Sequence, residues 1–322
     1  MCIFIFYGII RVTKTVAEKD MINSVKDFYD EKSCTLCPRG CSADRSTARG
    51  RCGAGSKIKI AAAMPHMWEE PCISGEKGSG TVFFSGCQLG CVFCQNKSIS
   101  LGNFGQEIDA LRFEQICFEL KDKGAHNISL VSADQYVPYV LPVLKKIKKE
   151  LALPIVYNCS GYQSPRLISA LEGVVDIYLP DLKFFSSEIS YRYAKAPDYF
   201  DIALSAIKQM AEQTGKPVIE DSLMKRGTMV RHLILPGHRR DSIDVIKRLG
   251  ESFNRDEIMV SLMAQYTPTD AQGAPKRRIT SFEYQSVCDE LEKYGFEGYY
   301  QQLSSAKQEY TPDFALQGVI KS

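Results

Sequence analysis

Residues 81–96 read TVFFSGCQLGCVFCQN, an apolar strand followed directly by a loop with three cysteines. The cysteines are Cys87, Cys91 and Cys94, in the spacing Cys-x3-Cys-x2-Cys. Three thiolates leave one position open on a bound metal or cluster, and an open position distinguishes a catalytic centre from a structural one. Zinc sites usually bring cysteines in Cys-x2-Cys pairs with a fourth ligand, so this spacing suits a [4Fe-4S] cluster with one unique iron.

The same three positions would also fall on one face of a helix, where cysteines are small buried side chains. Gly86 and Gly90 argue against a helix, because two glycines so close together are typical of a loop. The sequence therefore favours a ligand loop.

The cysteine pattern, with Phe93 as the aromatic residue before Cys94, resembles the signature of the radical S-adenosylmethionine (SAM) enzymes. Within that superfamily, residues 86–96 are similar to the glycyl-radical-enzyme activases, the group that includes pyruvate formate-lyase activating enzyme. The resemblance implies that the amino and carboxylate groups of SAM chelate the fourth iron. It also implies that an electron passed through the cluster cleaves SAM to methionine and a 5′-deoxyadenosyl radical.

From residue 81 onward, apolar β-rich segments alternate with amphipathic helical segments, which is the pattern of βα units around a parallel sheet. We expect strands near 81–86, 127–132, 154–159, 174–181, 228–235 and 257–264. We expect helices near 110–123, 136–150, 163–172, 200–214, 241–251 and 281–294. Six units are too few for a closed eight-stranded barrel. The predicted fold class is therefore α/β, a partial (βα)6 TIM-like barrel, which is also the radical SAM fold that the resemblance implies.

The predicted domain organisation has four parts. They are an N-terminal extension (1–32), a cysteine-rich metal-binding segment (33–75), the radical SAM partial barrel (76–300) and a C-terminal tail (301–322) that could cover the barrel mouth. Residues 2–10 are apolar but too few for a bilayer, which needs about 20, and they lack the flanks of a signal peptide. They are either an edge strand or translated sequence upstream of a true start at Met21.

Composition places limits on the setting of the protein. Twelve cysteines in 322 residues, without a recognisable secretory signal, are expected to be reduced and metal-bound rather than paired in disulfides. A net charge of +2 predicts no strong field for nucleic acid or membranes. We therefore expect a cytoplasmic protein that works at low oxygen.

A second group of cysteines precedes the barrel and consists of Cys34, Cys37, Cys41 and Cys52. Their segment is rich in glycine and basic residues, cannot build a core of its own and is expected to need a metal. The spacing x2, x3, x10 matches neither a bacterial ferredoxin run nor a paired zinc ribbon, so zinc and a second iron–sulfur cluster both remain open. Cys72 could join either group or neither. Similar cysteine-rich segments accompany one uncharacterised branch of activase-like proteins.

Polar residues follow the predicted strands at the edge where parallel barrels carry their sites. Residues 132–135 stand where many activases have a Gly-Gly-Glu turn that approaches SAM. Ser132 or Asp134 replaces its polar function, or Asp134 caps the next helix. Asn158 stands where activases have an acid, and it either hydrogen-bonds SAM or forms a turn.

The fourth and fifth strands contribute charged residues. Asp181-Leu-Lys183 resembles an activase motif whose lysine meets the SAM carboxylate; the alternative is a surface lysine at a strand end. Arg231 and His232 point to opposite faces of an extended chain, so only one looks into the barrel. A buried guanidinium needs an anion, and we expect the SAM carboxylate to serve Arg231, with His232 in the core. Lys183 and Arg231 are the predicted catalytic residues.

The remaining candidates concern the adenosine of SAM and the core. Phe93 is expected to pack beside adenine, to bury the loop that carries Cys87, Cys91 and Cys94 (the cluster loop), or both. Gln265 or Tyr266 could face the adenosine. The predicted SAM-binding set is Phe93, Asn158, Asp181, Lys183 and Arg231. Three further cysteines are read as core residues: Cys117, Cys159 and Cys288.

The resulting hypothesis is a radical SAM oxidoreductase that abstracts a hydrogen atom from a glycine of a partner glycyl-radical enzyme. A flavodoxin- or ferredoxin-type protein would donate the electron. An alternative is a radical SAM enzyme that modifies a peptide or small molecule, with an auxiliary cluster in the segment from Cys34 to Cys52. A more distant alternative is a non-catalytic interaction protein with zinc in both cysteine groups.

Overall fold

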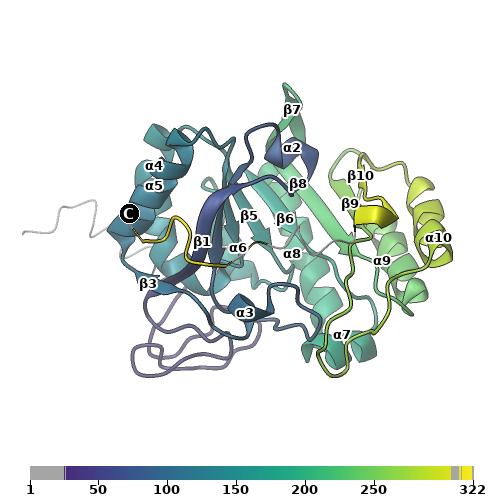
Figure 1. Ribbon diagram of the computed structural model, residues 1–322, viewed down its shortest axis with the longest axis horizontal. Coiled ribbons are helices and arrows are strands. Elements are labelled where there is room, and N and C mark those ends of the chain that lie inside the picture. The colour runs from purple at the N-terminus through teal and green to yellow at the C-terminus, as the bar shows by residue number, and fades with distance from the viewer. Residues whose placement is uncertain (1–24, 26, 306–311, 313, 321–322) are drawn as a thin grey trace, which may run out of the picture.

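Figure 1 shows the computed structural model, which describes residues 25, 27–305, 312 and 314–320. The described chain forms a ten-stranded sheet in the order β10-β9-β8-β6-β5-β4-β2-β1-β3, with β7 paired to β8 off this path. The predictions for residues 2–10 and for a start at Met21 lie outside the described residues.

Seven strands of the sheet run parallel to one another. They are β2 (Ser79–Phe84), β4 (Ile128–Val131), β5 (Ile155–Cys159), β6 (Ile177–Pro180), β8 (Leu223–Leu233), β9 (Met259–Met263) and β10 (Gly298–Tyr300). The central strands are buried on both faces, which is usual for parallel sheets covered by crossover helices. The predicted α/β fold is confirmed, and β2, β4, β5, β6, β8 and β9 correspond to the six expected strands.

Strands that the sequence did not predict complete the sheet. β1 (Ile58–His66) runs antiparallel to both β2 and β3 (Gln106–Ile108), and β7 (Val218–Glu220) forms a hairpin with β8. β1 reads IKIAAAMPH, with a run of consecutive buried residues and no alternation, so it carries little strand signal. It falls within 33–75, so the predicted cysteine-rich segment also contains one strand of the sheet.

Helices follow the parallel strands as expected. The longer ones are α4 (Ala110–Asp122), α5 (Val137–Leu151), α6 (Pro165–Leu171), α7 (Ser187–Ala194), α8 (Tyr199–Thr214), α9 (Arg239–Ser252) and α10 (Ser281–Glu292). Short helical turns occur at α2 (Pro71–Ser74), α3 (Lys97–Ser100), η1 (Asp134–Tyr136) and η2 (Leu303–Ser305). Side-chain caps fix several helix starts: Ser164 and Ser186 accept backbone N–H groups, and Thr280 forms a capping box with Glu283.

The two faces of the parallel sheet are covered differently. Leu130 and Tyr157 pack with residues of α4 and α5 in the largest apolar cluster. The neighbouring residue Val156 points the other way and packs with Leu179 and with Cys72 of α2 in a smaller cluster. Cys72 therefore lies in the core.

Strand register determines which residues meet at the carboxyl ends of the strands. Val131 is level with Asn158, and Asn158 is level with Leu179. A parallel bridge joins Asp181 to Arg231. The ends of β4, β5, β6 and β8 thus bring their polar residues to one edge of the sheet.

The C-terminal segment returns to the opposite side of the sheet, beside β1, where Figure 1 shows it in yellow. Ala63 donates its N–H to Gln317 O (2.8 Å), and Leu316 donates its N–H to Ala61 O (3.1 Å). Arg112 of α4 also donates to the carbonyls of Gly318 and Val319. Residues 316–319 are therefore fastened to β1 and α4.

Candidate active site

A cavity of about 240 Å³ opens at the carboxyl ends of the parallel strands. The structure places all of the residues predicted for the first cluster and for SAM on its walls. They are Cys87, Cys91, Cys94, Phe93, Asn158, Asp181, Lys183 and Arg231. This convergence is the geometric basis for the functional proposals below.

The three cysteines lie on an irregular loop between β2 and α3, so the alternative of a helix face is wrong. Gly86 and Gly90 both have positive φ (85° and 60°), a region that favours glycine. Burial raises the pKa of the Cys87 thiol to about 11 and raises that of Cys91 as well. A metal that binds these sulfurs must therefore displace protons from them.

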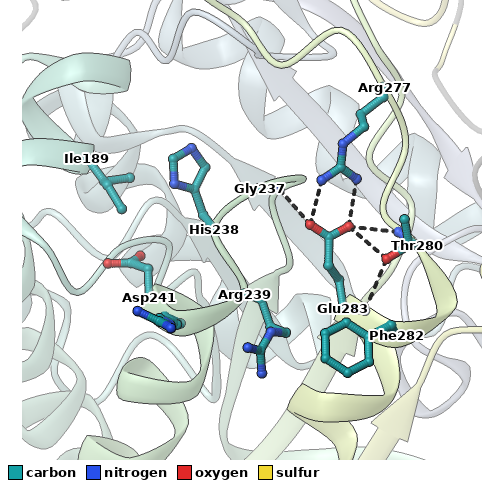
Figure 2. A pocket seen from close by; sticks show the side chains of 10 residues that line it. Ile189, Gly237, His238, Arg239, Asp241, Arg277, Thr280, Phe282 and Glu283 are labelled. Atoms are coloured by element: carbon teal, nitrogen blue, oxygen red, sulfur yellow. Dashed lines mark hydrogen bonds and ion pairs between the residues drawn. The ribbon is translucent and has the colours of Figure 1, made fainter.

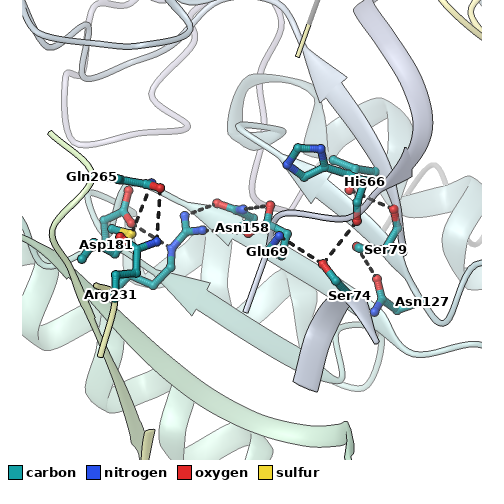
Figure 3. Close-up of polar contacts among 12 residues, drawn as sticks. His66, Glu69, Ser74, Ser79, Asn127, Asn158, Asp181, Arg231 and Gln265 are labelled. Carbon is teal, nitrogen blue, oxygen red and sulfur yellow. Dashed lines mark hydrogen bonds and ion pairs between the residues drawn. The ribbon is translucent and has the colours of Figure 1, made fainter. Parts of the chain in front are cut away.

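Arg231 is the centre of a buried network of charged and amide groups (Figure 3). Its guanidinium donates to Asp181 Oδ1 (3.0 Å), to Glu69 Oε2 (3.1 Å) and to Asn158 Oδ1. Asn158 Nδ2 also donates to Glu69 Oε1 (3.1 Å), which closes a ring of contacts. In the described chain the anions beside Arg231 are therefore two carboxylates of the protein itself, and a contact of Arg231 with the SAM carboxylate stays a prediction.

Glu69 was not among the predicted site residues. It follows β1, which the sequence pattern did not reveal, and its side chain is only 9% exposed at the wall of the cavity. The sequence signal was the pair Glu69-Glu70 between an apolar run and Pro71. Two adjacent acids next to an apolar segment with no nearby basic residue indicate a carboxylate with a distant partner.

The two carboxylates that bind Arg231 have pKa values that are shifted in opposite directions. Burial would raise the pKa of Asp181, but Arg231 and Lys183 outweigh it and hold that pKa below its ordinary value. Burial raises the pKa of Glu69 above its ordinary value, although Arg231 opposes the rise. Burial would likewise lower the pKa of Lys183, but the Asp181 carboxylate holds it above its ordinary value.

The turn from Asp181 to Lys183 is held in place by Tyr199. Its hydroxyl accepts the N–H of Lys183 (2.9 Å) and lies 2.8 Å from the carbonyl oxygens of Ser160 and Asp181. The Lys183 Nζ donates to Asp181 Oδ2. Lys183 is therefore a positioned group within the cavity wall and not a free surface lysine.

Phe93 lies among other rings at the base of the cluster loop. It packs edge-on against Phe184, Tyr193 and Tyr266, with ring centroids 6.0, 5.7 and 6.1 Å apart. Phe93 thus buries the loop and also borders the cavity. Gln265 lines the cavity, whereas the Tyr266 hydroxyl donates to Pro275 O (2.7 Å) outside it.

The turn after β4 differs from both expectations for Asp134. Its carboxylate accepts from Tyr157 Oη and Gln163 Nε2, both at 2.7 Å, and it neither lines the cavity that contains Cys87, Cys91 and Cys94 nor caps the helix. Ser132 does line the cavity, with φ +57°. Gln135 donates to the carbonyls of Ser85 and Gly86 and supports the cluster loop instead.

Several residues lie in the core as expected. His232 is fully buried with Nδ1 2.6 Å from Leu182 O, and burial lowers its pKa to about 4. Cys117 and Cys288 are buried on helices, and Cys159 is buried as well, although it also lines the cavity. Cys72 lines neither of the two cavities that contain cysteines.

The cavity walls fit the cofactors that the sequence implies. Three thiols at one end match a cluster with an open iron, and SAM is a zwitterion that needs both charged and hydrogen-bonding partners. The hydroxyl oxygen of Ser160 lines the cavity, is buried and has no hydrogen-bond partner in the described chain. A buried polar atom without a partner is uncommon, so a ligand that pairs with Ser160 fits the site.

The second group of cysteines borders a smaller cavity next to the cluster loop. Cys34, Cys37, Cys41 and Cys52 all line it. Burial raises the pKa of Cys37 to about 12 and also raises that of Cys52. Within the described residues, no three Cys, His, Asp or Glu side chains are gathered as ligands of a single ion. A metal at either cysteine group is therefore inferred from the ligand type and its surroundings.

The fold and the site define a class of protein, and comparison of the sequence agrees with it. Residues 81–264 match the radical SAM superfamily. Because this match covers more than half of the chain, the chain belongs to the radical SAM superfamily of enzymes. The alternative of a non-catalytic zinc protein is therefore wrong.

Two related proteins indicate to which branch of the superfamily the chain belongs. The uncharacterized protein MJ0674 of Methanocaldococcus jannaschii is 31% identical over 283 residues, which are 83% of this chain and 76% of that protein. The anaerobic ribonucleoside-triphosphate reductase-activating protein of Escherichia coli K12 is 32% identical over 120 residues, 35% of this chain and 78% of that protein. The predicted activase-like branch of the superfamily is thus confirmed.

A solved structure is similar in fold. The crystal structure of Streptococcus suis SuiB bound to precursor peptide SuiA matches with a TM-score of 0.50 and 14% sequence identity. The match covers 68% of this chain and 48% of SuiB, so the chain spans about half of the SuiB length. In the described part of the chain, no helix has the length and apolarity that a membrane crossing requires.

Proposed function

We propose that the chain binds a [4Fe-4S] cluster through Cys87, Cys91 and Cys94 and binds SAM in the adjoining cavity. The observation that carries this proposal is the single cavity that joins the three thiols to the Arg231 network. When bound, these cofactors supply a 5′-deoxyadenosyl radical for hydrogen abstraction. The part of the chain is to hold, orient and shield them.

The residues of the cavity wall divide this work. Lys183 offers the ammonium group beside Asp181 and is our candidate for the SAM carboxylate. Arg231 uses three of its five N–H groups to bind Asp181, Glu69 and Asn158 and so fixes their orientation, and it remains our candidate for SAM and for the catalytic step. Phe93 is our candidate for contact with adenine. Asp181 and Asn158 remain candidates for hydrogen bonds to SAM.

We propose that the hydrogen atom is taken from a backbone glycine of a partner glycyl-radical enzyme. The activase-like residues 86–96 support this, as does the similarity to a protein whose name describes it as activating a reductase. A flavodoxin- or ferredoxin-type protein would supply the electron. An iron with an open position is sensitive to oxygen, so the proposed setting is the cytoplasm at low oxygen.

We also propose that Cys34, Cys37, Cys41 and Cys52 hold a second metal, either zinc or iron in a cluster. Four thiols on one cavity wall supply a complete ligand set for either metal. The domain boundaries remain those proposed from the sequence: residues 33–75 hold the second metal and also contribute β1 and Glu69, and residues 76–300 form the catalytic barrel.

The test of SAM cleavage is anaerobic reconstitution, reduction with dithionite and assay for 5′-deoxyadenosine. We expect product from the wild type and from Cys72→Ser, whose thiol lies away from both cavities, and none above background from Cys87→Ala. Product from Cys87→Ala equal to that of the wild type would contradict the cluster assignment.

The test of the substrate uses the reduced enzyme, SAM and each glycyl-radical enzyme of the host. We expect the doublet of a glycyl radical by electron paramagnetic resonance from one of these partners. Intact SAM cleavage with no doublet from any partner would instead favour a peptide or small-molecule substrate.

A further inference from the structure

The cysteine-rich segment encloses a second cavity with a ligand set on its walls. Its four thiols come from Cys34, Cys37, Cys41 and Cys52. The sulfurs of Cys41 and Cys52 both lie 3.5 Å from the position that a Cβ on Gly50 would take. Two cysteines with ten residues between them in the sequence therefore bring their thiols to the same glycine.

A buried arginine that forms no ion pair lines this cavity. Arg45 is only 2% exposed, and its guanidinium donates to the backbone carbonyls of Gly55 and Gln135. No ion pair with Arg45 occurs among the described residues, and the rings of Tyr29 and Tyr139 lie next to it. The buried carboxylate of Asp134 lines the same cavity, where it accepts from Tyr157 and Gln163. Four metal-bound thiolates would add negative charge on the side of Arg45, whereas four neutral thiols would not.

The two groups of cysteines are in direct contact. The N–H of Cys87, a residue of the cluster loop, donates to the carbonyl oxygen of Cys52 (3.1 Å). Arg39 of the cysteine-rich segment donates to the carbonyl of Gln88 (2.9 Å) in the same loop. One hydrogen bond thus joins a proposed ligand residue of one centre to a proposed ligand residue of the other.

Each group has one buried cysteine, Cys34 or Cys91, and two of intermediate exposure. The fourth cysteine of the second group, Cys41, is exposed, so solvent reaches this group through it. The exposed residues Arg49 and Arg51 precede Cys52 in the sequence. We call the group of Cys34, Cys37, Cys41 and Cys52 the outer centre and the group of Cys87, Cys91 and Cys94 the inner centre. An acidic electron-transfer protein would therefore meet positive charge at the outer centre.

From these contacts we propose that the four cysteines hold an iron–sulfur cluster that relays single electrons to the cluster loop through Cys52 and Cys87. The proposal rests on the proposed function, because the relay needs an acceptor at Cys87, Cys91 and Cys94. Zinc has no redox chemistry and could not serve. A relay explains why the outer centre is bonded to a ligand residue of the inner one.

The relay step balances as a transfer of one electron. A donor of the flavodoxin or ferredoxin class loses one electron, and the outer cluster gains it. The outer cluster returns to its oxidised state when the electron moves on to the inner cluster, which is reduced by one electron. No covalent bond forms or breaks, and no proton is transferred.

The first experiment determines which metal each group of cysteines holds. Protein purified without air is analysed for iron, sulfide and zinc and examined by Mössbauer spectroscopy. We expect Cys34→Ser/Cys37→Ser to lose half of the iron, the Cys87→Ala/Cys91→Ala/Cys94→Ala variant to lose the other half, and Cys72→Ser to lose none. Zinc in the cysteine-rich segment would overturn the relay and leave the proposed function intact. Absence of iron from the cluster loop would overturn the proposed function itself.

The second experiment measures electron transfer. Rapid-mixing absorbance follows the reduction of the inner cluster by a reduced flavodoxin. We expect Cys34→Ser/Cys37→Ser to slow this step by an order of magnitude or more, with the midpoint potential of the inner cluster unchanged. An unchanged rate would overturn the relay.

A milder variant protects the test against loss of folding. Arg51 lines the outer cavity but is exposed, so Arg51→Gln is expected to retain all iron. Removal of its positive charge disfavours the reduced, more negative state, and the midpoint potential of the outer cluster should fall. Arg51→Lys, which keeps the charge, is the matched control. A potential that stays the same in Arg51→Gln would contradict a redox-active cluster in this cavity.

Discussion

Asp181 and Glu69 bind the same guanidinium from two walls of one cavity, yet their pKa values move in opposite directions. Asp181 stands at the end of the parallel strand β6 and has two cations, Arg231 and Lys183. Glu69 follows the antiparallel strand β1 and has Arg231 alone. Burial raises the pKa of both acids, Lys183 adds to the lowering by Arg231 at Asp181, and the Asp181 charge adds to the rise at Glu69.

The cost of burial and the attraction to cations therefore balance differently at Asp181 and at Glu69. At Asp181 the cations outweigh the cost of burial, so this wall is stable as an ion pair. At Glu69 burial outweighs its single cation, so the carboxylate is held there at a cost to folding. Groups kept in such an unfavourable state are typical of functional sites.

Removal of the shared cation should have the largest effect. Arg231→Met would leave Asp181 and Glu69 buried without their common partner, and we expect a loss of about 3–5 kcal/mol in the free energy of unfolding. Denaturant unfolding under anaerobic conditions measures the loss. Arg231→Lys keeps one charge and should lose less. A loss of only about 0–1 kcal/mol, as for a surface ion pair, would contradict the buried network.

The two acids should then differ from each other. Asp181→Asn leaves two cations with a single carboxylate, and we expect a loss of roughly 2–3 kcal/mol in the free energy of unfolding. Glu69→Gln also relieves the cost of a buried charge, so its loss should be about 1 kcal/mol or less. Unfolding midpoints of both variants test this order. The reverse order would mean that the comparison of the two walls is wrong.

The pH dependence of stability should also differ in sign. The depressed pKa of Asp181 adds stability that is present above the pKa of an unfolded Asp and is lost as the pH falls. The raised pKa of Glu69 adds stability that is present below the pKa of an unfolded Glu and is lost as the pH rises. Unfolding curves over a pH series should show that Asp181→Asn removes part of the acid loss. Glu69→Gln should remove part of the decline on the other side, and an identical pH profile for both variants would refute the assignment.

The smallest effect is expected at the unpaired hydroxyl. Ser160→Ala should weaken SAM binding to the reconstituted protein by about 1 kcal/mol, because one hydrogen bond to the ligand is lost. Calorimetric titration with SAM measures the change. Ser129→Ala is a matched control, since that hydroxyl is also buried without a partner but lies outside the cavity. Equal weakening in both variants would exclude a direct contact at Ser160.

The side of the cavity that the parallel strands β5, β6 and β8 form could largely be predicted from the sequence. Asn158, Asp181 and Arg231 each lie near the carboxyl end of an apolar strand, and the carboxyl ends of parallel strands meet at one edge. Strand alternation also separated Arg231 from His232, and the structure places the arginine at the cavity and the histidine in the core.

The side of the cavity that carries Glu69, after the antiparallel strand β1, could not be predicted in the same way. Glu69 follows a strand without alternation, and its partners Asn158 and Arg231 are far away in the sequence. Asp134 was misjudged for a related reason: Tyr157 and Gln163 bind it from β5 and the loop that follows. Local sequence patterns do not reveal hydrogen-bond partners that are distant in the sequence. The role of a buried carboxylate can therefore be assigned only when the residues around it in the structure are known.

The fastening of residues 316–319 to β1 has a consequence for the cavity. Ala61 and Ala63 of β1 form backbone hydrogen bonds with Leu316 and Gln317. β1 leads directly to Glu69 at the cavity wall, whereas residues 316–319 do not line the cavity. A substitution in this distant segment can therefore alter the site through the backbone of β1.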